Sequence, residues 1–135
     1  MNFKEVIKLS NENIIVLPEN KYDIEMVRFD WHSIDWSKAK RRVRNLNVCG
    51  YTNWKIPTVE EMKFITTQIN FEEMETLAIG GVKSDPKFWT SDVAIWLTTT
   101  VPLAMKSVLY KSGKECPGDS CNHLLNCCYI RYAEK

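Results

Sequence analysis

Residues 50–62 read GYTNWKIPTVEEM, and this stretch sets the turn of the chain into a helix. Pro57 has a fixed φ and disfavours helical geometry in the residue before it. Thr58 and Glu61 then form an S/T-x-x-E pattern, in which each side chain bonds the other residue's backbone at the start of a helix. Trp54 is interpreted as a core anchor, because large aromatic side chains bury much apolar area. The stretch therefore predicts a sharp change from an extended loop to a helix.

Two amphipathic helices are predicted on either side of this turn. The apolar residues of the first helix recur at steps of three and four, which places them on one face, and Asp35 is a suitable N-cap. These apolar residues are Trp36, Ala39, Val43 and Leu46. In the second helix, Met62, Ile65 and Ile69 continue a buried stripe after the cap. Each helix is therefore expected to pack one apolar face on a core.

Strands are predicted before and after the helices. They are expected at residues 13–17, 22–31 with a shift of phase after Met26, 88–90, 95–97, 101–110 and 128–132. A turn is expected at 111–114. Strands, then two helices, then strands are typical of an α+β fold rather than a parallel βαβ sheet.

The length and composition suit one domain over residues 1–135. Hydrophobic residues make up 44% of the chain and charged residues 26%, so the chain can bury a core and stay in solution. The two termini are expected to lie close together. The predicted core contains Trp36, Val43, Leu46, Trp54, Ile65, Trp89 and Ile130.

The charge and hydropathy patterns limit the classes of partner. A net charge of +1 argues against a protein that coats nucleic acid, because such binding rests largely on neutralising phosphates. No window approaches the roughly 18 apolar residues of a membrane span. Lys4, Glu5 and Lys8 interrupt any signal-peptide core in the first ten residues. The expected location is cytoplasmic if the chain is complete and extracytoplasmic if a leader has been removed.

Several stretches together resemble a known family. They are W-x-x-A-x-x-x-V-x-x-L from Trp36, the GYTNWKIPT block, Phe88-Trp89-Thr90-Ser91 and Tyr129-Ile130-Arg131. This pattern, over about 36–131, is similar to the bacterial family of the C-terminal domain of the collagen-like adhesin Lcl. The resemblance implies a C-type-lectin-like fold, with two helices packed on a small twisted, mostly antiparallel sheet with long loops. Val43 stands where the family's helix often carries a cysteine, so the family's disulfide is expected to be missing.

The C-terminal third holds thiols and a histidine with the atoms that zinc prefers. The weak metal candidates are Cys116, Cys121, His123 and Cys127. Their spacings match no C-x2-C knuckle, so we predict no metal and no other cofactor, and expect free thiols. A Cys116–Cys121 disulfide is an alternative, because residues 116–121 resemble a turn-rich loop whose ends approach each other.

An enzyme is the alternative in a different functional class. The formylglycine-generating enzymes share the lectin-like fold, and their two copper-binding cysteines precede the last strand, loosely where Cys121 and Cys127 lie. No Ser/His/Asp set or phosphate-binding glycine loop is legible, and two histidines leave acid–base chemistry few participants. A non-catalytic binding or protein-interaction module is therefore predicted. A structural subunit of a larger assembly is the second alternative, and the oligomeric state is left open.

Two surfaces are candidates for binding a glycan or a protein. The first is a predicted loop face between residues 92 and 126, because lectin-like folds hold variable loops on a rigid scaffold. Its candidates are Asp92, Trp96, Asp119, Asn122 and Asn126, although a buried role is favoured for Trp96. The second is the basic face of the first helix. Such a face is usually only the solvated side of an amphipathic helix. If it does bind a partner, its charge suits a sulfated glycan or an acidic protein surface. It carries Lys38, Lys40, Arg41, Arg42 and Arg44.

Overall fold

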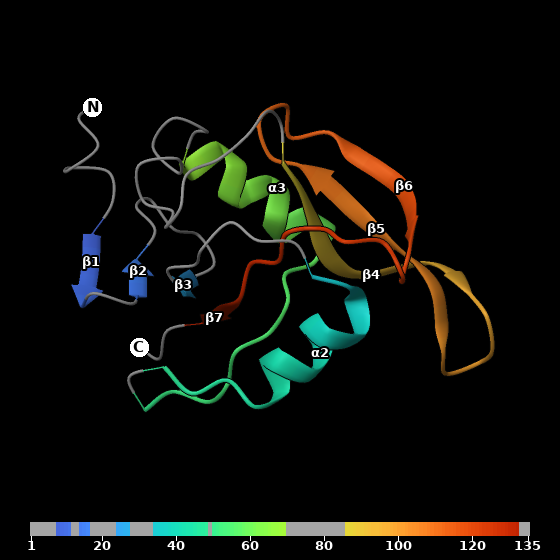
Figure 1. Cartoon of the computed structure of the whole chain (residues 1–135). Helices are drawn as coiled ribbons and strands as arrows, with labels where there is room; N and C mark the ends of the chain where they lie inside the picture. Colours follow the sequence, from blue (N-terminus) through green and yellow to red (C-terminus); the bar gives the residue numbers. More distant parts are fainter. Residues whose placement is uncertain are drawn as a thin grey trace.

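The computed structural model describes residues 8–11, 14–16, 24–27, 34–48, 50–69 and 86–132. In this part, strands come first, then two helices, then strands again (Figure 1). The elements are β1 (Lys8–Asn11), β2 (Ile14–Val16), β3 (Ile24–Val27), α2 (Trp36–Arg44), α3 (Val59–Gln68), β4 (Lys87–Trp96), β5 (Pro102–Leu109), β6 (Glu115–Ser120) and β7 (Ile130–Tyr132). The predicted α+β class is confirmed.

The described strands form two antiparallel sheets, whereas the family resemblance implied one small sheet. The first sheet has the order β1-β2-β3-β7, and the second has the order β4-β5-β6. The last strand closes the first sheet, because Ile130 pairs with Met26 of β3. The first and last described strands therefore lie in one sheet. We predicted that the two termini lie close together, but the terminal residues lie outside the described part of the chain.

Helix α2 begins at the predicted cap. Asp35 Oδ1 accepts a hydrogen bond from the Lys38 amide at 2.8 Å. Trp36 and Ala39 are buried, as their spacing predicted. Val43, like Leu46, is only partly buried and packs at the edge of the core. One face of α2 therefore contributes to the core, and the contribution weakens toward the end of the helix.

Helix α3 begins with the predicted capping box. The Glu61 amide donates to Thr58 Oγ1 at 3.1 Å, and the Thr58 amide donates to Glu61 Oε1 at 2.9 Å. The buried stripe of this helix is also confirmed, because Met62, Ile65 and Ile69 are completely buried. The sequence therefore predicted both the start of α3 and the face that it buries.

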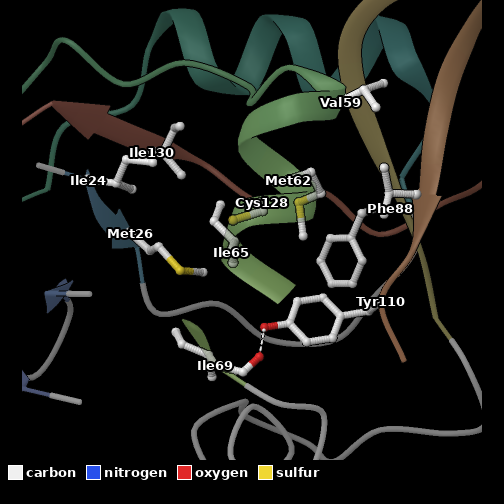
Figure 2. Close-up of a cluster of buried hydrophobic side chains, with 11 residues drawn as sticks. Ile24, Met26, Val59, Met62, Ile65, Ile69, Phe88, Tyr110, Cys128 and Ile130 are labelled. Atoms are coloured by element: carbon white, nitrogen blue, oxygen red, sulfur yellow. Dashed lines mark hydrogen bonds between the residues drawn. The ribbon is translucent and has the colours of Figure 1, made fainter. Parts of the chain in front are cut away.

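Helix α3 packs between the two sheets. Figure 2 shows Ile24, Met26 and Ile130 of the first sheet on one side of the helix, with Phe88 and Tyr110 on the other side. The Tyr110 hydroxyl donates to the backbone carbonyl at the end of the helix at 2.7 Å. This cluster consists of Ile24, Met26, Val59, Met62, Ile65, Ile69, Phe88, Val108, Tyr110, Cys128 and Ile130. Burial on the shared helix joins the two sheets.

A second cluster lies against α2 and contains three tryptophans. Trp36 and Trp89 pack with their ring centroids 5.8 Å apart, and Trp89 Nε1 donates to the Ile34 carbonyl at 2.7 Å. Trp54 is 6% exposed and donates from Nε1 to the Tyr51 carbonyl at 2.8 Å. Each of these two indole N–H groups therefore has an acceptor, as buried polar groups require.

Strand β6 replaces the turn-rich loop that we predicted at residues 116–121. Pro117 and Gly118 are common in turns, but β6 lies at the edge of its sheet, where a proline does not interrupt a ladder on both sides. A Cβ at Gly118 would lie 3.0 Å from the Cβ of Ala94. Glycine therefore allows β6 to approach β4, a reason that the sequence alone does not reveal.

The burial of Trp54 gives a stability prediction. Trp54→Ala should lower the free energy of unfolding by about 3–5 kcal/mol, because it removes a large buried side chain. The matched control is Trp96→Ala, which truncates a tryptophan that is 55% exposed and should change stability by about 0.5 kcal/mol or less. Urea unfolding followed by circular dichroism measures both. A cost below about 1 kcal/mol for Trp54→Ala would contradict its assignment to the core.

Candidate functional site

Residues 92–126 were predicted to be loops, but strands occupy most of this segment. Three of its five candidate residues also have structural partners. Asp92 Oδ2 accepts from the Val59 amide at 2.8 Å and so stabilises the start of α3. Asn126 pairs through its backbone with Lys87 and Trp89 of β4. Asp119, the third of them, is bonded inside the second sheet. Polar side chains that looked free in the sequence therefore hold the strands and α3 together.

Asp119 lies at the centre of a small polar cluster on β6. Its Oδ2 accepts from Ser107 Oγ at 2.6 Å, and its Oδ1 lies 3.2 Å from Lys87 Nζ and 3.5 Å from His123 Nδ1. Burial alone would raise the pKa of Asp119, but the bonds from Ser107 and Lys87 and the charge of Lys87 outweigh it and lower the pKa. The serine and the histidine both bond the carboxylate. A catalytic triad needs the histidine to bond the serine, so this cluster is no nucleophilic centre.

Trp96 is exposed, so the buried role that we favoured for it is wrong. Trp96 ends β4, and the hairpin that β4 forms with β5 extends past the helices (Figure 1). We call residues 95–103 the hairpin tip. Its apolar side chains are 46% to 63% exposed and comprise Ile95, Trp96, Leu97, Val101 and Leu103. An exposed group of apolar side chains of this kind marks a candidate interaction surface.

The turn of the hairpin tip is closed by its own hydrogen bonds. The amides of Leu97 and Thr98 donate to the Val101 carbonyl at 2.9 and 3.2 Å. Thr98 Oγ1 accepts in return from the amides of Val101 at 3.0 Å and Thr100 at 3.3 Å. The backbone of the turn is therefore satisfied locally, and Cys121 bonds the carbonyls of Pro102 and Leu103 at the base of the tip.

A cavity of about 190 Å³ lies between α2 and the hairpin tip. Trp36, Ser37 and Lys40 line it from the helix, and residues 100–102 line it from the hairpin. Cys121 completes the lining, and its Sγ donates to the Pro102 carbonyl at 3.6 Å. We call this space the α2–hairpin cavity. It joins an apolar surface to the start of a basic helix.

The basic face of α2 is exposed, as the sequence predicted. Lys38, Lys40, Arg41, Arg42 and Arg44 all face solvent. Arg42 also lies over the ring of Tyr129, 5.7 Å from its centroid. Among the described residues, no carboxylate forms an ion pair with the other four. The last loop-face candidate, Asn122, is exposed in the turn after β6.

The structure does not gather the predicted metal candidates. Within the described ranges, no group of three or more His, Cys, Asp or Glu side chains could hold a metal ion. Cys116 and Cys121 lie five steps apart along an extended chain, so their Cα atoms are roughly 16 Å apart, and disulfides span less than about 7 Å. The alternative disulfide is therefore excluded, and both thiols are free.

The buried cysteines are poor nucleophiles. Burial raises the pKa of Cys127 to about 12, and burial with the neighbouring Cys127 raises the pKa of Cys128. Burial also raises the pKa of Cys121. The reactive form of cysteine is the thiolate, so a raised pKa suppresses both nucleophilic attack and metal binding. The two cysteines of the enzyme alternative, Cys121 and Cys127, are therefore held in the protonated state.

Sequence reasoning missed four apolar residues of the hairpin tip and the α2–hairpin cavity. The tip residues are Ile95, Leu97, Val101 and Leu103, and the cavity also involves Trp36. We expected extended chain at 95–97 and 101–110, and apolar strands usually indicate core. The sequence feature that could have revealed the hairpin tip is the run of three threonines at 98–100. A polar run of this length between two apolar segments fits a hairpin turn with apolar residues on both strands.

Comparison with known proteins leaves the family open. The chain matches no protein-family model, and no curated protein matches it significantly. In the part of the chain that the structure describes, no helix has the length and apolar character needed to cross a membrane.

The burial of the thiols predicts an order of alkylation. At a pH of about 8, iodoacetamide should modify Cys116 in the folded protein, Cys121 more slowly because of its raised pKa, and Cys127 and Cys128 only after unfolding. A second, isotopically heavy reagent added in denaturant, followed by peptide mass spectrometry, separates the two classes. Modification of Cys127 in the folded protein as fast as that of Cys116 would contradict its raised pKa and would favour the enzyme alternative.

Proposed function

We propose that the chain is a non-catalytic binding module with a C-type-lectin-like fold, related to the C-terminal domain family of the adhesin Lcl. The two helices between strands support the fold, and so does the start of α3 directly after Pro57, because the resemblance rests on that stretch. The ligand is a sulfated glycan or a protein surface. The binding site is the hairpin tip with the adjoining α2–hairpin cavity.

One observation carries this proposal, namely the exposure of five apolar side chains on a projecting hairpin beside a cavity. Exposed apolar groups cost free energy in water, so five of them on one hairpin suggest a surface that is covered in a complex. Trp96 is the strongest anchor, because tryptophan is enriched among the residues that dominate binding energy. Trp96 and Pro102 pair directly across the hairpin, so their side chains share one face, and Pro102 lines the cavity.

Two variants test the location of the site. Immobilised protein is screened with an array of sulfated glycans and with a displayed library of random peptides. Binders should lose about tenfold or more in affinity on Trp96→Ala, because the anchor is removed. The control is Asp92→Ala, which should lower stability by about 0.5–2 kcal/mol, through loss of its bond to α3, and leave binding unchanged.

Other outcomes would overturn the proposal. Binders that depend on Asp92 and ignore Trp96 would move the site away from the hairpin tip, toward the junction of β4 with the start of α3. An absence of binders, with stable oligomers in sedimentation, would favour a structural subunit. Binding that is lost only when Lys38, Arg41 and Arg42 are changed to Glu would move the site to the helix alone.

A further inference from the structure

We propose that the partner of the hairpin tip is an acidic segment of another protein that inserts an apolar side chain into the α2–hairpin cavity. This inference rests on the proposed function and specifies the chemistry of the partner at the same site. It follows from the lining of the cavity, in which apolar surface from Trp36 and the hairpin lies beside the basic Lys40 of α2.

The apolar part of the argument concerns the walls of the cavity. Trp36, Val101 and Pro102 supply hydrophobic surface, and Val101 is also exposed to solvent at the rim. A water molecule occupies about 30 Å³ of liquid, so a cavity of about 190 Å³ has room for a group the size of a side chain. Trp96 stands on the same face of the hairpin as Pro102 and extends the apolar surface beyond the rim.

The electrostatic part concerns helix α2. Its nine residues include five basic side chains and no acidic one. Lys40 lines the cavity, while Lys38, Arg41 and Arg44 are exposed on the same helix. The nearest carboxylate along the chain, Asp35, already accepts a bond from the Lys38 amide as the N-cap. Among the described residues no carboxylate pairs with Lys40, Arg41 or Arg44, so carboxylates of a partner would complement their charges.

An acidic peptide fits this surface better than the other anionic partners. A sulfated glycan matches the charge of α2, but its hydroxyl and sulfate groups offer little to the five apolar side chains of the tip. An anionic membrane would take up the tip and attract the helix, but a flat interface places no side chain into a cavity between them. A peptide with an apolar residue between carboxylates uses the tip, the cavity and the helix together.

The test starts from peptides selected on the wild-type protein from a random displayed library. Selected sequences should be enriched in Asp and Glu around one aromatic or aliphatic residue. Synthetic copies with every Asp and Glu replaced by Asn and Gln should bind about tenfold more weakly at low salt, and raising the salt to about 0.3 M should shrink this difference. Replacing the central apolar residue by Ser should weaken binding at both salt concentrations.

Matched charge reversals locate the complementary surface. Lys40→Glu should remove the preference for acidic over neutral peptides. Lys114→Glu makes the same change in the turn at the other end of β5, and it should leave the preference intact. Circular dichroism checks that both variants fold. A loss of preference in both variants alike would show that net charge, and not the cavity, selects the peptide.

The remaining arms separate failure of this inference from failure of the proposed function. Neutral or basic selected peptides that still depend on Trp96 would overturn the acidic partner and leave the binding site in place. Tighter binding of another ligand through Trp96 than of any acidic peptide would also overturn the acidic partner and leave the binding site in place. The ligands to compare are a heparin fragment and vesicles of phosphatidylcholine with phosphatidylserine. If no peptide, glycan or vesicle depends on Trp96, both proposals fail together.

Discussion

The rest of the structure depends on the buried carboxylate of Glu61 at the start of α3. Its side chain is 5% exposed, accepts from the Thr58 amide, lies 3.0 Å from Lys55 Nζ and accepts from the Tyr132 hydroxyl. A buried charge is costly unless it is paired and hydrogen-bonded, so these partners must be in place together. Lys55 also forms a backbone bridge with Ile130 of β7. The start of α3 is thereby fastened to the first sheet.

The same turn of α3 holds the second sheet. The Val59 amide donates to Asp92, and the Ser91 amide donates to the Pro57 carbonyl at 2.9 Å, so β4 is fixed at its middle. Beyond Asp92, the described ladder of β4 is formed with β5 alone, and the paired strands carry the hairpin tip away from the core (Figure 1). One rigid joint therefore explains both the stable body and the projecting apolar surface, and function at the tip is compatible with a well-packed core.

The sequence predicted the features that local physical chemistry determines. Asp35 and Thr58 cap their helices because their side chains bond nearby amides, and such bonds depend on a few neighbouring residues only. A buried role was favoured for Trp96, although it was also a binding candidate, because an apolar strand end has no local mark of exposure. Pro117 and Gly118 were assigned to a turn, since their place at a sheet edge depends on strands far along the chain. The sequence named Trp96 and the basic residues of α2 as candidates, but it missed the cavity for the same reason, because the cavity joins residues from α2, the hairpin and Cys121.

The central claim is that the start of α3 fastens both sheets, and native-state hydrogen exchange followed by NMR tests it most directly. The account predicts that the amides of Val59, Ser91 and Ile130 exchange only through global unfolding, with opening free energies equal to the unfolding free energy. The amides of Leu97 and Val101 at the hairpin tip should exchange through much cheaper local opening. Exchange of the Val59 or Ile130 amide with an opening free energy as low as that of the tip would contradict the account, because the joint would then open while the rest of the protein stayed folded.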